Sequence, residues 1–487
     1  MIFFYILLGI LVVLIAVLLF RTMQFSKPPL SENQLEEISL NTQSIAEHLS
    51  EVIQIQTISH SADQPPEKAV FEELHQKLER MFPETHKNLK LEKINQFSLL
   101  FTWTGSQPDL EPILFMAHQD VVPADPATLD AWDNPPFSGK ITDKYIYGRG
   151  TLDIKNQMIA SMEAVEYLLS NGFQPKRSIM LAFGHDEEIG GPQGARKIVE
   201  HLKEKGVHLA AVIDEGGAII DGTLPGLNGP SAMVGNVEKG YLTLNLSIES
   251  EPGHSSSPPP HTAIGILAKA ITLLEANPLP ADINAIKPLF ENAAPFMSFG
   301  LRMVLANLWL FGDLVLNKLN ASPQTAAMVR TTTAVTIIKG GIKDNILPRE
   351  AVASVNFRIL PGDTVDSVVA YVRRVINNDD IQIDIVKGNG WNPSHISPTD
   401  STAFDLLRIA ILDVFGNIPV APYLVGGATD SRYFYEICDH VYRFSPLIMP
   451  SEDLGSIHGI NERISLENMS NMVKYFIHLI KLWEKQA

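Results

Sequence analysis

Residues 113–120 read Ile-Leu-Phe-Met-Ala-His-Gln-Asp, an apolar run that ends in an imidazole, an amide and a carboxylate. Five consecutive apolar residues bounded by polar ones predict a strand buried on both faces, the strand type of a parallel sheet covered by helices. In open α/β sheets, the side chains that do chemistry follow the carboxyl ends of the strands. We therefore expect His118 and Asp120 to lie in a crevice at the edge of such a sheet.

Strands and helices alternate along much of the chain. Further apolar runs predict strands over residues 179–183, 210–213, 420–425 and 440–444. Helical periodicity begins near residue 42 and returns over residues 156–169, 192–205, 402–415 and 466–483. This order predicts an α/β fold, a mostly parallel sheet sandwiched by helices, built from residues 41–238 and 391–487.

The pattern changes between these two stretches. Residues 241–249 alternate apolar and polar, which is typical of a strand with one buried face. The elements that follow predict the order βαββαβ over residues 239–390, a ferredoxin-like two-layer domain inserted into the larger one. We expect this inserted domain to act as a lid.

An additional apolar segment, residues 278–330, interrupts the predicted lid, and its most apolar part covers residues 296–319. One interpretation is a helical pair packed on the lid or at a dimer contact. The other is an apolar wall for a long acyl chain, or a surface that touches a membrane.

The first 20 residues contain no charged side chain, and Arg21 ends the run. Twenty apolar residues in a helix cross a bilayer core. Because no clear cleavage site follows, we predict an uncleaved membrane anchor over residues 1–20, with a removed signal peptide as the alternative. A polar stalk over residues 21–40 follows. Basic residues lie only after the helix, at Arg21 and Lys27, and this favours a cytoplasmic catalytic domain by the positive-inside rule.

Length and composition exclude several classes of protein. A chain of 487 residues exceeds one ordinary core, so two domains are expected. The net charge of −17 and the lack of a basic stretch argue against nucleic acid as a partner. The single cysteine, Cys438, excludes an intramolecular disulfide, and its apolar neighbours predict a buried core residue.

Acidic and imidazole side chains gather in short motifs that follow predicted strands or lie in loops. The motifs are His118-Gln119-Asp120, Gly148-Arg149-Gly150 with Asp153, Asp186-Glu187-Glu188, Asp214-Glu215-Gly216-Gly217 and Ile457-His458-Gly459. Two divalent ions about 3.5–4 Å apart need roughly three protein ligands each, with one carboxylate shared. Imidazole and carboxylate ligands suit zinc where thiols are absent. Together, the motifs predict a two-metal hydrolase.

Each motif also has a plainer interpretation when it is taken alone. A single histidine is more often structural, and Asp153 can cap the helix that begins near residue 156. Glu187 and Glu188 repel each other unless positive charge lies between them, so without a metal they would form a solvated acidic loop. With a metal, we expect one of them to bind it and the other to act as general base and acid. Asp120 faces the same side of the chain as His118 and can orient its imidazole.

These motifs resemble those of the co-catalytic zinc metallopeptidase family that includes glutamate carboxypeptidase, carboxypeptidase S, aminoacylase, acetylornithine deacetylase and the N-fatty-acyl-amino-acid synthase/hydrolases. The resemblance runs from about residue 45 to the C-terminus. It is also carried by residues 116–123, 135–139, 184–188, 252–256, 307–311, 329–334 and 455–462. It implies a zinc-exopeptidase-like fold with a lid.

The resemblance implies roles for the metal-binding positions. His118, Asp153 and Asp214 match the ligands of one zinc ion. Asp153, Glu188 and His458 match those of the other, so that Asp153 bridges the two ions.

The resemblance also implies the roles of the remaining site residues. Glu187 matches the general base, and Asp120 matches the carboxylate that supports the histidine ligand. In the lid, His254 matches the residue that stabilises the tetrahedral oxyanion. Asn345 and Arg358 match groups that bind the substrate carboxylate or the scissile carbonyl, and the forked guanidinium of arginine suits a carboxylate.

We therefore expect a metal-dependent hydrolase of amide bonds next to a free carboxylate. Its substrates would be N-acyl amino acids, N-fatty-acyl ones among them, cleaved or reversibly formed, or the C-terminal bonds of peptides. The alternatives are an aminopeptidase or dipeptidase on the same fold, and a non-catalytic binding protein tethered to a membrane. The resemblance further implies a homodimer formed through the lid. Exported members of the family favour a catalytic domain outside the cytoplasm, against the charge rule.

Overall fold

The apolar run that begins at Ile113 forms β3 (Ile113–His118), which is buried along its whole length in the interior of a ten-stranded sheet. Its neighbours β6 (Ile179–Gly184) and β7 (Ala211–Asp214) run parallel to it, so the three carboxyl ends meet at one edge. This computed structural model describes residues 1–25, 37–61, 64–222, 226–227 and 229–485.

The strand order of the large sheet is β1-β2-β6-β3-β7-β17-β9-β8-β18, and β16 pairs with β9 outside this path. The remaining strands are β1 (Lys90–Ile94), β2 (Ser98–Trp103), β8 (Ile219–Asp221), β9 (Pro230–Glu238), β16 (Val420–Val425), β17 (Val441–Arg443) and β18 (Ile448–Pro450). β17 runs parallel to β7, and β16 runs parallel to β9. The mostly parallel sheet is confirmed, although the pairs β1–β2, β2–β6, β8–β9 and β9–β17 are antiparallel, which the apolar pattern did not predict.

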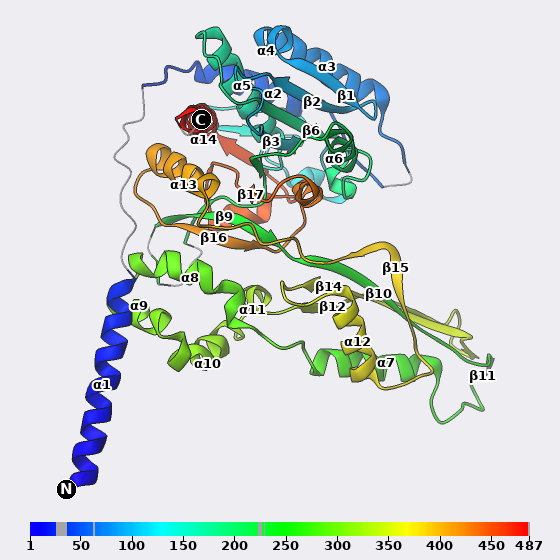
Figure 1. Ribbon diagram of the computed structural model, residues 1–487. Helices are drawn as coiled ribbons and strands as arrows, with labels where there is room; N and C mark the ends of the chain where they lie inside the picture. Colours follow the sequence, from blue (N-terminus) through cyan, green and yellow to red (C-terminus); the bar gives the residue numbers. More distant parts are fainter. Residues whose placement is uncertain (26–36, 62–63, 223–225, 228, 486–487) are drawn as a thin grey trace.

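Helices cover both faces of this sheet (Figure 1). Alternate residues of β3 therefore pack into two different hydrophobic cores, one on each face. Phe115 packs in one core and Leu114 in the other. The helices on the Phe115 side include α2 (Thr42–Ile53), α5 (Lys155–Ser170), α13 (Thr402–Phe415) and α14 (Leu466–Glu484). On the Leu114 side lies α6 (Ala195–Glu204). We call this body the large unit.

Smaller elements complete the large unit. They are the helices α3 (Lys68–Met81) and α4 (Pro83–Asn88), a three-stranded sheet of β4 (Lys140–Ile141), β5 (Tyr145–Tyr147) and β19 (Arg463–Ser465), and the 3-10 helices η1 (Pro126–Ala131), η2 (Glu187–Ile189), η5 (Asp430–Glu436) and η6 (Ser451–Ser456).

A second sheet of four antiparallel strands, in the order β12-β14-β10-β15, lies between the two halves of the large unit in the chain. Its elements follow the predicted order βαββαβ: β10 (Gly240–Glu249), α7 (Ala263–Ala276), β12 (Thr332–Gly340), β14 (Glu350–Ile359), α12 (Val365–Ile376) and β15 (Gln382–Trp391). Leu242, Leu244 and Phe357 pack with both helices on one face. We call this body the antiparallel unit. A ribbon of β11 (Gly253–His254) and β13 (Ile346–Leu347) lies at its far tip (Figure 1).

The apolar segment 278–330 forms a chain of short helices. They are η3 (Ile283–Ile286), α8 (Lys287–Ala293), η4 (Ala294–Phe296), α9 (Phe299–Ala306), α10 (Leu308–Leu319) and α11 (Pro323–Val329). Helix α8 packs on β16, where Leu289 and Phe290 share a core cluster with Met233 and Ala421. The segment therefore packs on the large unit, whereas the first interpretation of the sequence places it on the lid or at a dimer contact.

The N-terminal apolar run forms α1 (Ile2–Gln24), a 23-residue helix whose apolar side chains are almost all exposed. By length and composition it can span a membrane, as an anchor or as a signal sequence. The stalk expected over residues 21–40 is described only in part: α1 continues to Gln24, and residues 26–36 lie outside the described residues.

Candidate metal centre

His118, the last residue of β3, is 1% exposed, and its two ring nitrogens have different surroundings. Nδ1 lies 2.8 Å from the backbone carbonyl oxygen of Asp120, an acceptor, and this contact places the ring proton on Nδ1. Nε2 lies 3.0 Å from Asp153 Oδ1 and 3.3 Å from Glu215 Oε1. A histidine held by Nδ1 with Nε2 facing carboxylates has the arrangement of a metal ligand.

Asp153 lies between two imidazoles from distant parts of the chain. Its Oδ1 is 3.0 Å from His118 Nε2, and its Oδ2 is 2.9 Å from His458 Nε2. His458 has a positive φ of 58° and a half-exposed side chain, and its Nε2 is also 3.3 Å from Glu188 Oε2. A carboxylate whose two oxygens face two different histidines is the arrangement required of a ligand shared by two ions.

The turn after β6 carries Glu187 and Glu188 at the start of η2. Both carboxylate oxygens of Asp120 hold this turn: Oδ1 accepts the backbone N–H of Glu187 and Oδ2 accepts that of Glu188, each at 3.1 Å. Asp120 is fully buried and its Oδ1 is also 3.4 Å from His118 Nδ1. It thus positions the acidic turn as well as the histidine, although the sequence predicts only the second contact.

The two acids at the end of β7 point in different directions. Asp214 belongs to neither group of possible metal ligands, and its Oδ2 accepts the backbone N–H of Ser431 at 2.9 Å. Glu215, one residue later, faces the opposite side of the extended chain and brings Oε1 to 3.3 Å from His118 Nε2. The acid that joins the cluster is therefore Glu215, whereas the resemblance implies Asp214.

The cluster concentrates carboxylates in a buried space. Burial raises the pKa of Glu187 well above its usual value and that of Glu215 to about 8, and repulsion between neighbouring carboxylates adds to both shifts. Hydrogen bonds to Asp153 and Glu188 raise the pKa of His458 to about 10. Buried acids of this kind need a cation to remain charged.

The donors fit a metal ion. Two groups have ligand atoms within 4.8 Å of one another: His118, Glu187 and Glu215, and His118, Asp153 and Glu188. They offer imidazole nitrogen and carboxylate oxygen, the donors that zinc accepts where thiols are absent. Cys438 is buried elsewhere, in the core beneath α6.

A buried ion pair fastens the loop of His458 to the turn of Asp153. The Arg149 guanidinium pairs with Glu462 Oε2 and donates to the carbonyl oxygen of Gly459 at 3.0 Å. Glu462 Oε1 accepts the backbone N–H groups of Gly150, at 3.0 Å, and Leu152, at 2.7 Å. Two loops about 310 residues apart in the sequence are thereby joined just where each presents a ligand.

The predicted substrate-binding residues of the antiparallel unit belong to neither group of possible metal ligands. His254 and Asn345 are exposed at the ribbon at its tip, where Ser255 N–H donates to the carbonyl oxygen of Asn345 at 3.2 Å (Figure 1). Arg358, on β14, has its guanidinium 4.6 Å from the centre of the Tyr241 ring. Burial lowers the pKa of Arg358.

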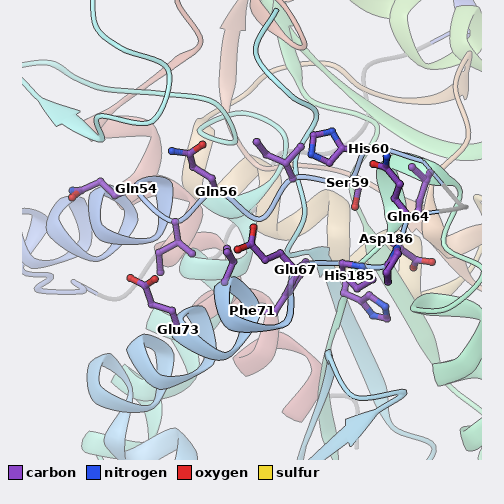
Figure 2. A pocket seen from close by; sticks show the side chains of 16 residues that line it. Gln54, Gln56, Ser59, His60, Gln64, Glu67, Phe71, Glu73, His185 and Asp186 are labelled. Atoms are coloured by element: carbon purple, nitrogen blue, oxygen red, sulfur yellow. The ribbon is translucent and has the colours of Figure 1, made fainter.

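A cavity of about 400 Å³ borders the acidic turn; His60, His185 and Asp186 stand around it (Figure 2). Asp186 is occupied in holding the turn, because its Oδ2 accepts the backbone N–H of Gln193 at 2.7 Å. His185 Nδ1 contacts Ser98 Oγ at 2.7 Å. Nothing in the sequence motifs predicted this cavity.

A second cavity, of about 640 Å³, opens where the two units meet, and its lining includes Gly190, Lys239, Trp391 and Arg432. Arg432 donates to the carbonyl oxygen of Gly190 and lies 4.7 Å from the centre of the Trp391 ring. Cationic side chains from both units therefore lie beside the turn that carries Glu187.

The chain matches the model of peptidase family M20/M25/M40 over residues 114–482. It is 42% identical over 481 residues to the N-fatty-acyl-amino acid synthase/hydrolase PM20D1 of Xenopus tropicalis, covering 97% of this chain and 93% of that protein. It is 34% identical over 483 residues to carboxypeptidase S of Saccharomyces cerevisiae, covering 89% and 83%. Among solved structures, an M20 family metallo-carboxypeptidase from Sulfolobus solfataricus has the same fold, with a TM-score of 0.66, 19% identity and coverage of 91% of this chain and 99% of that one.

The chain therefore belongs to peptidase family M20/M25/M40. It is a metal-dependent hydrolase of amide bonds, and the suspected family is confirmed.

Proposed function

We propose that this enzyme hydrolyses the amide bond of N-acyl amino acids, N-fatty-acyl amino acids among them, and that it also forms this bond in reverse. The proposal depends chiefly on the position of Asp153 between two histidines: its carboxylate oxygens lie 3.0 Å from His118 Nε2 and 2.9 Å from His458 Nε2. The acyl class is supported by the 42% identity to an N-fatty-acyl-amino acid synthase/hydrolase over nearly the whole chain.

We assign one divalent ion to His118, Asp153 and Glu215, and a second to Asp153, Glu188 and His458. Glu215 takes the place predicted for Asp214, because the Asp214 carboxylate is engaged by the Ser431 N–H. Zinc is the ion that this donor set favours. Two divalent ions held there would supply Lewis acidity, which would polarise an amide carbonyl and lower the pKa of a water molecule.

We propose Glu187 as the base that accepts the proton of the attacking water on Oε2 and passes it to the leaving amine. Its Oε2 is 4.0 Å from His118 Nε2, so it is engaged less closely with His118 than the carboxylates of Asp153 and Glu215 are. Burial raises its pKa, which suits a carboxyl group that takes and returns a proton near neutral pH.

The free carboxylate of the substrate is the feature we expect the enzyme to recognise. We retain Arg358 as a binding group, together with Asn345, which lies beside His254 at the tip of the antiparallel unit and would serve the site of a second copy. The cationic cavity lined by Lys239 and Arg432 supports an anionic substrate beside the acidic turn. Arginine and lysine in a partly buried cleft bind a carboxylate and discriminate against the neutral amide.

We propose a homodimer in which His254 of one chain serves the metal centre of the other, with the antiparallel unit closing over the site as a lid. His254 lies in β11, at the tip of its own unit (Figure 1), and belongs to neither group of possible metal ligands in its own chain. The edge strand β12 exposes Ile337 by 50% and Ile338 by 59%, and an exposed apolar edge is suited to pairing with a second copy.

A carboxypeptidase activity is the second candidate, supported by the 34% identity to carboxypeptidase S. The test is hydrolysis of an N-oleoyl amino acid and of a blocked dipeptide at equal concentration, each with and without a chelator, followed by mass spectrometry. Chelator-sensitive preference for the oleoyl substrate supports the proposal, and preference for the dipeptide replaces it with the carboxypeptidase. Amidation of the carboxylate should abolish cleavage, whereas an aminopeptidase would still cleave the amide.

We also propose that α1 stays attached as a membrane anchor, with the catalytic part outside the cytoplasm. The length and apolar composition of α1 support the anchor. An alkaline phosphatase fused after Ala487 should be active in intact cells, because that enzyme folds only outside the cytoplasm. An inactive fusion would indicate the opposite orientation of α1, with the catalytic part in the cytoplasm.

A further inference from the structure

Helix α10 reads Leu-Trp-Leu-Phe-Gly-Asp-Leu-Val-Leu-Asn-Lys-Leu, yet none of its residues is buried. Trp309 is 55% exposed, Leu310 45% and Leu314 64%. Helix α9 adds Phe299 at 50% and Leu301 at 40%. Large apolar side chains gathered on one short helical pair mark a surface that something apolar covers. We call this surface, formed by α9 and α10, the apolar corner.

The apolar corner is fastened to the last turns of α1. Thr22 of α1 is fully buried, and α1 packs on α9. Asn307, at the bend between α9 and α10, donates its side-chain N–H to the carbonyl oxygen of Leu18 at 3.2 Å. The Thr22 hydroxyl donates to the same carbonyl at 2.6 Å.

These hydrogen bonds set the depth of the corner relative to α1. Leu18 lies within the uncharged run of α1, three residues before Arg21, or about 4.5 Å along the helix. The amide of Asn307 is fully buried and also donates to the carbonyl oxygen of Met303, at 2.8 Å. Polar groups in the hydrocarbon of a bilayer must be hydrogen-bonded within the protein, and the side-chain amide of Asn307 meets this requirement.

The direction of α10 fits a membrane-facing element. In Figure 1, α10 lies on the side of the large unit from which α1 projects, and α8 lies between it and the large sheet. Helices α9 and α10 meet at 108° and together are apolar enough to count as one broken or re-entrant span. Trp309, whose ring N–H donates to Asn307 Oδ1 at 3.3 Å, is the side chain type enriched at membrane interfaces.

We propose that α9 and α10 are a second membrane-embedded element, which inserts the apolar corner into the leaflet from which α1 emerges and holds the large unit against the bilayer. The proposal rests on α1 serving as an anchor and is independent of the substrate. Lipid is the occupant because the corner is continuous with α1, whose own exposed side chains need the same apolar surroundings.

The chain is suited to a direct test by spin labelling. Its single cysteine, Cys438, is 1% exposed, so a cysteine introduced at the surface is the only accessible thiol. Leu310→Cys and Leu314→Cys place a nitroxide on the apolar corner. Leu129→Cys, on η1 and 45% exposed, is the matched control. Wild type treated with the same reagent gives the background.

Each labelled full-length chain is reconstituted into phosphatidylcholine vesicles, and collision with oxygen and with a water-soluble nickel chelate is measured. We expect the labels at positions 310 and 314 to collide several-fold more with oxygen and several-fold less with the chelate than the label at 129. Equal accessibility at the three positions would overturn the proposal, and so would a chain that does not float with the vesicles. Spin–spin broadening together with exclusion of the chelate would show instead that a second copy covers the corner. Both leucines are exposed, so agreement between the two positions guards against a local disturbance at one of them.

Discussion

Glu187 occupies the position from which a carboxylate can move a proton without being needed to hold the fold. Its backbone N–H is bound by Asp120, and its side chain stands 4.0 Å from His118 Nε2. Glu187→Gln keeps the size of the side chain but removes its basic oxygen. We expect the rate to fall by about 10²–10⁴, the usual contribution of a general base, with two equivalents of metal retained. The measurement is kcat together with metal content by mass spectrometry, and an unchanged kcat would remove Glu187 from the proposed role.

Glu215 and Asp214 make opposite predictions when each is neutralised. Glu215→Gln takes a carboxylate from the cluster around His118, so we expect about one equivalent of metal to be lost, with most of the activity. Asp214→Asn leaves an oxygen that can still accept the Ser431 N–H, so we expect both ions to remain. Metal content of the two variants, purified side by side, is the comparison. If Asp214→Asn loses metal and Glu215→Gln does not, the ligand is Asp214, as the resemblance implies.

The sequence motifs place the acidic pair at the end of β7, but they do not decide which of its members faces the cluster. The side chains of adjacent residues in an extended chain point to opposite sides, so only one of Asp214 and Glu215 can face the cluster. Only the contact of the Asp214 carboxylate with the backbone N–H of Ser431, on η5, settles its direction. That contact joins residues more than 200 positions apart, which no local pattern contains.

At the scale of elements, the loop of His458 and the turn of Asp153 depend on the same ion pair. Glu462 is fully buried and holds Arg149 as well as the N–H groups of the turn. Glu462→Gln leaves the Arg149 charge buried without its partner, a change that costs about 3–5 kcal/mol of the free energy of unfolding. We also expect weaker metal binding, because Asp153 and His458 lose their common support.

The control for this pair is an exposed one. Lys203 and Glu436 form an ion pair with side chains 59% and 58% exposed, so Glu436→Gln should change the free energy of unfolding by less than about 1 kcal/mol. Urea unfolding of both variants and the wild type, with chelator present throughout, separates the fold from the metal. Equal effects of the two substitutions would mean that the buried pair does not fasten the loops.

The sequence predicted the bounds of elements whose apolar residues recur at a regular spacing. It did not predict elements that contain buried polar residues. The helix predicted over residues 402–415 is α13 with the same bounds. Strand β9, by contrast, was missed, since it carries Asn236 and Glu238, which a pattern of apolar residues assigns to the surface. Both are buried because tertiary partners satisfy them: Asn236 donates to the carbonyl oxygen of Ser397, and Glu238 pairs with Arg443 at 2.8 Å.

For the whole molecule, buried neutral histidines set a pH dependence of stability. Burial lowers the pKa of His75 and of His185 to about 4, below the value of about 6.5 in an unfolded chain. Between these values the unfolded chain binds more protons, so the free energy of unfolding falls as the pH drops from about 6.5 towards 4. Each histidine contributes roughly 1–3 kcal/mol to this loss.

The variant His75→Gln isolates one of these contributions, because glutamine does not titrate and can still donate to Gln119. The free energy of unfolding of the wild type, minus that of the variant, should decrease as the pH falls through this window. A difference for His75→Gln that is flat with pH would show that its imidazole stays accessible to protons in the folded chain.

The last prediction concerns the assembly, since His254 lies in β11 at the tip of the antiparallel unit (Figure 1) and outside the groups of possible metal ligands of its own chain. If His254 of one chain serves the other, Glu187→Gln and His254→Ala are each inactive alone for different reasons. In a mixed dimer, the chain that keeps Glu187 receives an intact His254 from its partner, so one of the two sites works. Random exchange makes half of the dimers mixed, and the mixture should therefore recover about a quarter of the wild-type activity. Activity that stays absent, in a sample shown by mass spectrometry of the native complex to contain mixed dimers, would place the action of His254 within its own chain.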